Sequence, residues 1–246
     1  MTDERVEEMA VESQAAARNR LARWTGAVYL AFIVLFATCS TVQGRIVSSD
    51  PAATARTIQH SMMLFRAAFL GEIVSALLFF SAAWCLYLLL KPVGRGLAVL
   101  LMLLNLAGVA AECAATSLRF GALQWLASGD PLRGFTSDQA QAMAMLIEHV
   151  GGAGMIVATL FYGAWLYPLG WLVYKSGFIP RFWGVLLLAD AVSMTICFVQ
   201  QGFFPACAKW TYPLYPIMFV AEAGTALWLL VKGASTKPSR PLTTDH

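Results

Sequence analysis

Isolated ionisable residues inside long apolar runs are the features of this sequence that could do chemistry. Glu72, Glu112 and Glu222 each supply the one charge of such a run, and Glu148 is followed directly by His149. Carboxyl and imidazole groups can bind a cation, pass a proton or ligate a metal. Which of these reactions the residues can perform depends on the solvent around the apolar runs and on the structural elements that position the side chains.

The composition indicates that this solvent is lipid. Of the 246 residues, 59% are hydrophobic and 13% are charged, whereas soluble domains carry about 25% charged residues. So few charges cannot cover the surface of a globule of this size in water. The net charge of +3 is small, and the Lys and Arg residues form no block. The sequence therefore argues against a nucleic-acid partner and favours the lipid bilayer.

Six stretches reach the length of about 20 residues that a helix needs to cross the hydrocarbon core. A helix also satisfies its own backbone hydrogen bonds, as lipid requires. We predict an all-α polytopic membrane helix bundle with six transmembrane helices, formed by residues 24–233. The predicted spans are 24–44, 67–90, 96–118, 148–174, 182–202 and 210–231, and the cytoplasmic tails are 1–23 and 234–246.

The distribution of basic residues predicts that both chain ends are cytoplasmic. With the N-terminus inside, most of the 17 Lys and Arg residues lie on the inner side, as the positive-inside rule requires. Short helices are expected on the outer surface. One begins at Asp50 and Pro51, and another follows a cap at Thr136 or Ser137, before the fourth span.

Most of the polar residues of the spans are predicted to share the outer half of the bilayer and to form a candidate polar cavity. A charge on the lipid face at mid-depth costs about 2.5–3.5 kcal/mol, so these side chains should face the interior. We expect Arg66 to pair with Glu72 or Glu112, and Arg119 with Glu148; acids without a partner are expected to be neutral. The members of this set are Arg66, Glu72, Glu112, Arg119, Glu148, His149 and Glu222.

Three further residue groups carry local predictions. His149 is expected to be an interior histidine with satisfied hydrogen bonds, and a proton relay or a weak metal ligand are its alternatives. The glycines at positions 151, 152 and 154 should allow close approach of a neighbouring helix. A bridge between Cys197 and Cys207 is compatible with an oxidising outer face, although spacing does not establish it.

Several long segments resemble one family. They include "AATARTIQHSMMLFRAAFLGEIVSALLFFSAAWCLYLLLKPVGRGLAVL", "GWLVYKSGFIPRFWGVLL" and "AEAGTALWLLVKG". Together they resemble the bacterial membrane family called domain of unknown function 4386, over most of residues 24–233. The resemblance implies a multi-pass protein of the bacterial cytoplasmic (inner) membrane and implies no activity. Asp190 departs from the family pattern, in which this helix is purely apolar, so any role of Asp190 would be particular to this chain.

Three function classes remain open. The favoured one is a binding or scaffold protein with a buried polar network, which holds helices in register or takes a small polar or cationic ligand. The second is a small-solute or proton-coupled transporter or channel. The third is an intramembrane metal-dependent enzyme built on His149. No HExxH, GxSxG, P-loop or CxxC pattern is present, so no cofactor is predicted and no catalytic residue is assigned.

Overall fold

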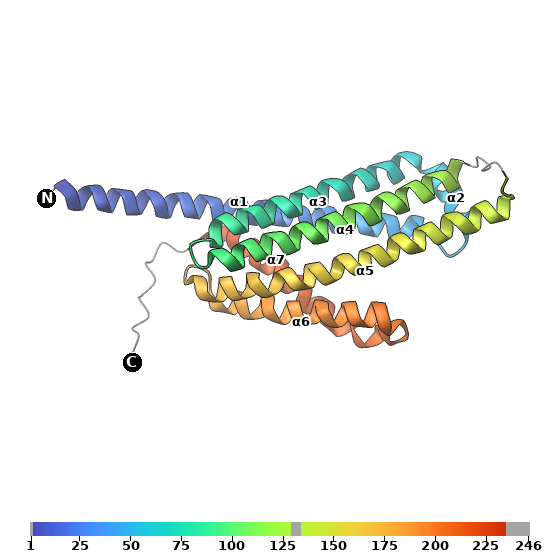
Figure 1. Ribbon diagram of the computed structural model, residues 1–246. Helices are drawn as coiled ribbons and strands as arrows, with labels where there is room; N and C mark the ends of the chain where they lie inside the picture. The colour runs from blue at the N-terminus through green and yellow to red at the C-terminus, as the bar shows by residue number, and fades with distance from the viewer. Residues whose placement is uncertain (1, 129–133, 235–246) are drawn as a thin grey trace.

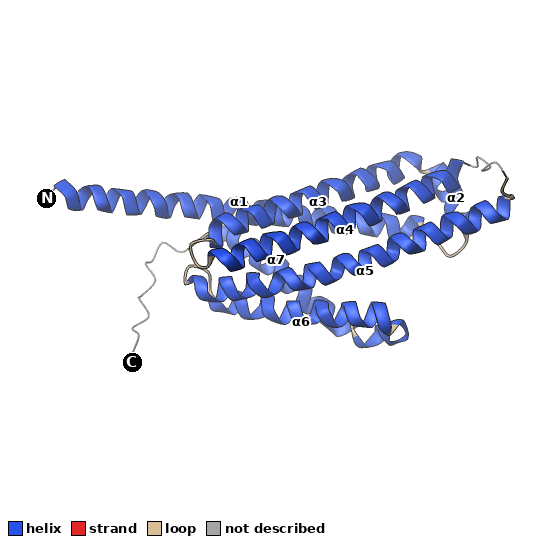
Figure 2. Cartoon of the chain, viewed as in Figure 1, coloured by secondary structure: helices blue, strands red, loops and turns tan. Residues whose placement is uncertain are grey.

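A computed structural model of the chain describes residues 2–128 and 134–234, and this part is helical apart from short connections (Figures 1 and 2). No strand occurs in these two ranges. The elements are α1 (Thr2–Ile46), α2 (Pro51–His60), α3 (Met62–Leu90), α4 (Arg95–Ser128), α5 (Ser137–Ser176), α6 (Arg181–Phe203), the 3-10 helices η1 (Pro205–Trp210) and η2 (Tyr212–Leu214), and α7 (Tyr215–Lys232). The predicted all-α bundle is confirmed.

Six of these helices are long and apolar enough to cross a membrane: α1, α3, α4, α5, α6, and α7 together with η2. They run alternately in opposite directions, as short connections between consecutive spans require (Figure 1). The predicted number of spans is therefore confirmed. The first part of α1 projects beyond the ends of the other helices.

The six long helices form a closed ring. Each packs against the next in chain order, and α7 completes the ring by packing against α1. Closure depends on Gly26 in α1, because a Cβ built there would lie 2.4 Å from the backbone nitrogen of Leu230 in α7. A side chain at position 26 would therefore push the first and last spans apart. The ring encloses an interior to which all six helices contribute.

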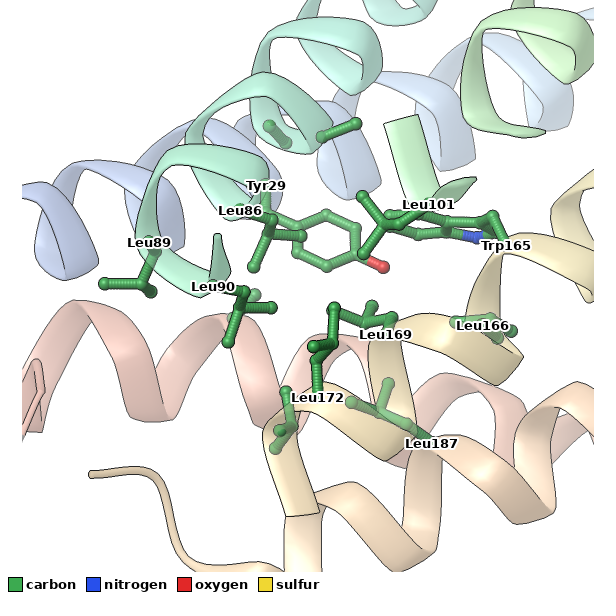
Figure 3. Close-up of a cluster of buried hydrophobic side chains, with 14 of the residues drawn as sticks. Tyr29, Leu86, Leu89, Leu90, Leu101, Trp165, Leu166, Leu169, Leu172 and Leu187 are labelled. Atoms are coloured by element: carbon green, nitrogen blue, oxygen red, sulfur yellow. The ribbon is translucent and has the colours of Figure 1, made fainter. Parts of the chain in front are cut away.

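One end of this interior is filled by a hydrophobic core. Figure 3 shows Tyr29 and Trp165 beside Leu86, Leu101 and Leu169, all of them at most 2% exposed. These leucines lie near the tight turns that join α3 to α4 and α5 to α6. The turn after α5 needs a residue in the left-handed backbone conformation, and Gly177 adopts this conformation with φ of 70°. The bundle is thus sealed at the end that carries these turns.

The two predicted helix starts on the other side are confirmed. The Asp50 side chain accepts a hydrogen bond from the Ala52 amide at 2.9 Å, and Pro51 opens α2. Thr136 and Gln139 form a capping box at the start of α5. However, α5 continues without interruption to Ser176, so the predicted second surface helix is the beginning of the spanning helix itself.

The structure describes the N-terminal tail, one residue of the C-terminal tail and the two cysteines of the suggested bridge. The N-terminal tail is the first part of α1 and is continuous with the first span. Of the predicted C-terminal tail, only Ala234 lies inside the described residues. Cys197 is buried and Cys207 is exposed, and both are free thiols, so the structure contains no bridge between them.

Candidate functional site

A cavity of about 390 Å³ lies inside the ring. Every spanning helix contributes to its wall. The polar and sulfur-bearing lining residues are Glu112, Met155, Thr159, Tyr162, Met194, Cys197, Gln201, Tyr215, Met218 and Glu222, and the purely hydrophobic ones are Phe32, Ile33, Phe36, Ala37, Phe79, Phe219 and Ala223. Cavities of about 300–1,000 Å³ are typical of small-molecule sites. The wall is largely apolar, with two carboxyl groups.

The first carboxyl belongs to Glu112 of α4, which is only 2% exposed. Its Oε2 accepts a hydrogen bond from the hydroxyl of Tyr162 on the neighbouring helix α5. Its Oε1 has no hydrogen-bond partner among the described residues. One oxygen is therefore held in place by a tyrosine, and the other is left with its hydrogen-bonding capacity unused.

The second carboxyl, on the other side of the ring, also accepts a hydrogen bond from a tyrosine of the neighbouring helix. Oε2 of Glu222 on α7 accepts a hydrogen bond from the hydroxyl of Tyr29 on α1. The Tyr29 side chain is fully buried. Tyr162 lies within electrostatic range of Glu222 as well as Glu112, so the two acid–tyrosine units face a common space. Buried tyrosines usually need an acceptor for the hydroxyl, and these two acids provide it.

A third acid lies behind the cavity wall. Asp190 of α6 is 0% exposed, and neither of its carboxyl oxygens has a hydrogen-bond partner within the described chain. It lies within electrostatic range of both Glu222 and Tyr29. Asp190 thus adds negative charge, or a proton, next to the Glu222 side of the cavity.

Among the residues that the structure describes, no basic side chain balances the acids at the cavity. The lining residues include no Lys, Arg or His. The nearest guanidinium by sequence, Arg119, is engaged elsewhere: its Nε lies 3.1 Å from Oε1 of Glu148, as predicted. The carboxyls of Glu112 and Glu222 must therefore be neutralised by protons or by a bound cation, since an unpaired charge in low dielectric is costly.

Arg119 and Glu148 belong to a separate cluster together with Glu72, called the outer cluster after the side of the membrane that the sequence predicts for it. Glu72, which is 7% exposed, lies there within reach of the Gln43 side chain and of the charge of Arg119. The side chain of Arg119 passes over Gly151, where a Cβ would lie 2.3 Å from its Cγ. The cluster links α1, α3, α4 and α5.

The glycines of α5 are not equivalent. Gly154 also packs closely against α4, with a built Cβ 3.0 Å from that of Ala115. Gly152 has nothing within 4 Å, so it does not serve close approach. The predicted helix contact is thus confirmed at positions 151 and 154, and it is wrong at position 152.

Two of the predicted residues do not reach the interior. Arg66 is exposed, and no ion pair joins it to Glu72 or Glu112 in the described structure. The side chain of His149 is 76% exposed, and its Nδ1 lies 2.9 Å from the carbonyl oxygen of Met145. Consecutive helix residues point about 100° apart, so a helix that turns Glu148 toward Arg119 turns His149 outward. The predicted interior position of His149 is therefore wrong.

The structure thus divides the seven predicted residues among three places. Glu112 and Glu222 line the cavity, and Glu72, Arg119 and Glu148 form the outer cluster, whereas Arg66 and His149 are exposed. The part of the chain that the structure describes contains no group of three His, Cys, Asp or Glu side chains able to hold a metal ion. His149 consequently lacks the companions that a metal site needs.

Sequence reasoning missed the two tyrosines and the place of Asp190. Tyr29 and Tyr162 stand in apolar runs where they are indistinguishable from other packing aromatics. One sequence signal could have identified them: the hydroxyl of a tyrosine within a membrane span requires a hydrogen-bond acceptor, and the carboxyl groups of the other spans are the available acceptors. Asp190 was visible as an acid in an apolar run, but its neighbour Glu222 is brought to it only by the packing of α6 against α7.

A closed ring of six membrane-length helices around an internal cavity defines a polytopic integral membrane protein of the helix-bundle class. The profile of the family described as domain of unknown function 4386 matches residues 24–233, and the chain belongs to this family. No curated protein and no solved structure matches the chain significantly. The family region contains both acid–tyrosine units.

Proposed function

We propose that this integral membrane protein is a binding protein whose central cavity takes one small ligand. The observation that carries the proposal is the cavity of about 390 Å³, which every spanning helix lines. Its wall includes the carboxyl groups of Glu112, which is buried, and of Glu222, which is half-buried. A scaffold needs no such space, because helices joined only for structural reasons pack without voids of this size.

The lining defines what the ligand must look like. Phe32, Phe36 and Phe79 supply flat apolar surface, and Met194 and Met218 supply flexible side chains that adapt to an irregular partner. A small, wholly polar solute would lose its hydration without compensation on such a wall. The ligand therefore has an apolar body and a polar group that reaches the carboxyls, which narrows the polar or cationic ligand expected from the sequence.

Transport of the same ligand is the second candidate. The acids near mid-membrane favour it, since intramembrane carboxyls mark many solute and proton pathways. Passage to the other side would need the core around Leu86, Leu101 and Leu169 to open. Because this core fills the end with the tight turns, binding from one side is the simpler function. Counterflow of a bound ligand in proteoliposomes would distinguish transport from binding.

The proposed location is the bacterial cytoplasmic membrane, with both termini inside. The location rests on the resemblance described in the sequence analysis, and the orientation rests on the bias of the Lys and Arg residues. Reporter fusions at each terminus test the orientation. Activity of a cytoplasmic reporter at both ends supports it, and activity of a periplasmic reporter at either end contradicts it.

Native mass spectrometry of the purified protein tests the binding function. We expect a small-molecule adduct on the natural protein that is lost in Ala223→Phe, in which a larger side chain fills the cavity. Ala114→Phe is the matched control, because Ala114 is exposed on the outside of α4. Equal adducts on both variants would indicate peripheral lipid. No adduct at all, with an undiminished Tm in Ala223→Phe, would contradict a binding role and favour a scaffold.

A further inference from the structure

We infer that the polar group of the cavity ligand is an organic cation, an amine or quaternary ammonium on an apolar body, held between Glu112 and Glu222. This inference rests on the proposed binding function and specifies its ligand class. It combines three features of one cavity: unbalanced carboxyls, an unused buried acceptor and aromatic side chains in the wall.

The charge of the cavity wall is of one sign. Glu112 and Glu222 face the space, Asp190 stands behind Glu222, and no basic residue belongs to the lining. In the outer cluster, by contrast, Arg119 is paired with Glu148 at 3.1 Å. Acids that serve only to join helices are expected to have such a partner, because an uncompensated charge destabilises the bundle. In the proposed complex, the ligand supplies the positive charge that the cavity wall lacks, in place of one of the protons that neutralise the acids of the ligand-free protein.

The hydrogen bonds of the acids leave room for this ligand. Tyr162 and Tyr29 each donate to the Oε2 atom of their glutamate and fix its orientation. Oε1 of Glu112 remains without a partner, although the residue is only 2% exposed and lines the cavity. A buried acceptor without a donor is a costly arrangement. An amine cation stabilises it through an N–H donor, and a quaternary ammonium stabilises it through its charge alone.

The aromatic side chains offer the second kind of contact that cations use. The ring centroids of Phe32 and Phe79 lie 4.1 Å apart, and those of Phe79 and Tyr162 lie 5.1 Å apart. All three residues line the cavity. A cation within about 6 Å of an aromatic face is attracted by its quadrupole, and aromatic cages are a recurrent site for quaternary ammonium groups. The apolar body of the ligand packs against the same rings.

Charge balance sets how the cation enters. In the ligand-free cavity the carboxyls hold protons, because no basic side chain shares the space. Binding of one monovalent cation leaves the site neutral when one carboxyl releases its proton to water. The other carboxyl keeps its proton and can donate it in a hydrogen bond to the ionised carboxylate. No oxidant, metal or further reactant is needed.

The test uses two probes of the same shape and different charge. Benzyltrimethylammonium is a permanent cation without an N–H group, and neopentylbenzene is its neutral isostere, with carbon in place of nitrogen. Binding of tritiated benzyltrimethylammonium is measured on the full-length protein in a nonionic detergent by scintillation proximity, and neopentylbenzene is added as a competitor. We expect saturable binding, with the neutral isostere weaker by about tenfold or more because it lacks the charge–charge contact.

Substitutions locate the binding. Glu112→Gln and Glu222→Gln should each weaken binding of the cation by about tenfold. Glu148→Gln is the matched control, because Glu148 lies in the outer cluster and not in the cavity. It should leave the affinity unchanged. The comparison of the two probes on the natural protein requires no variant, so the inference remains testable if a substitution prevents folding.

The outcomes separate this inference from the proposed function. If neopentylbenzene competes as well as the cation and Ala223→Phe abolishes both, the cavity binds ligands but does not select charge, and the inference is overturned. If neither probe binds, the inference is also overturned, whereas an adduct that Ala223→Phe removes would still support the binding function. Equal losses in Glu112→Gln and Glu148→Gln would show that the effect is structural, and they too overturn the inference.

Discussion

Replacing Tyr162 with phenylalanine removes the one hydrogen-bond donor that the described structure gives to Glu112. The ring and its packing against Phe79 remain, so the change isolates the hydroxyl. After the substitution, neither oxygen of a carboxyl that is 2% exposed has a protein partner. The bundle should therefore be less stable.

The expected loss follows from two ranges. Leaving a buried acceptor unsatisfied costs about 1–3 kcal/mol in proteins generally. Side-chain hydrogen bonds between membrane helices average about 0.6 kcal/mol and reach about 1.7 kcal/mol. Because Glu112 has no second donor, we expect a value near the upper end, about 1.5 kcal/mol of the free energy of unfolding. Water that enters the cavity limits the loss.

Tyr167→Phe is the matched control on the same helix. The Tyr167 hydroxyl is exposed and lies 3.3 Å from Oγ1 of Thr195, so its removal should cost about 0.5 kcal/mol or less. The free energy of unfolding is measured by titrating the protein in mixed micelles with sodium dodecyl sulfate and following circular dichroism. A double-mutant cycle of Tyr162→Phe with Glu112→Ala isolates the pair. Equal losses in the two tyrosine variants, or a coupling energy near zero, would refute the assigned hydrogen bond.

Two further predictions concern the ring and the outer cluster. Gly26→Ala should lower the free energy of unfolding by more than about 2 kcal/mol, because its Cβ would lie 2.4 Å from the backbone of α7. Gly44→Ala is the control: its Cβ would meet nothing within 4 Å, so the change should be neutral or stabilising by up to about 1 kcal/mol. Similar losses in both would contradict ring closure at α1 and α7. Arg119→Met should cost about 1–2 kcal/mol because it leaves Glu148, whose side chain is 14% exposed, without its cation. Arg66→Met should cost less than about 0.5 kcal/mol, since Arg66 is exposed; a larger cost for Arg66 than for Arg119 would contradict the assignment of the ion pair.

The sequence was sufficient for the features that depend on local rules. The six spans follow from apolar length, and the starts of α2 and α5 follow from Asp50, Pro51 and Thr136. The Arg119–Glu148 pair was also predictable, because both residues fall near the same end of two consecutive predicted spans, and such spans pack side by side. Each of these predictions needs only the length of a helix and the order of the chain.

The remaining features depend on how each helix is rotated about its axis. A one-residue step on a helix separates Glu148, which faces Arg119, from His149, which faces outward. The charges suggested Arg66 as a partner of Glu112, but the structure pairs Glu112 with Tyr162. Such choices are set by side-chain packing between α4 and α5, which spacing along one helix does not encode.

The central claim is that Glu112 and Glu222 face a cavity inside the ring that a small apolar molecule can enter, and mapping of carbodiimide labelling tests it most directly. Dicyclohexylcarbodiimide adds to protonated carboxyls in apolar surroundings and leaves a stable acylurea, which peptide mass spectrometry locates. The account predicts labelling of both glutamates in the folded protein, loss of that labelling in Ala223→Phe, and its persistence in Ala114→Phe. Equal labelling in all three proteins would mean that the acids face lipid, and labelling only after unfolding would mean that no accessible cavity exists; either result would contradict the account.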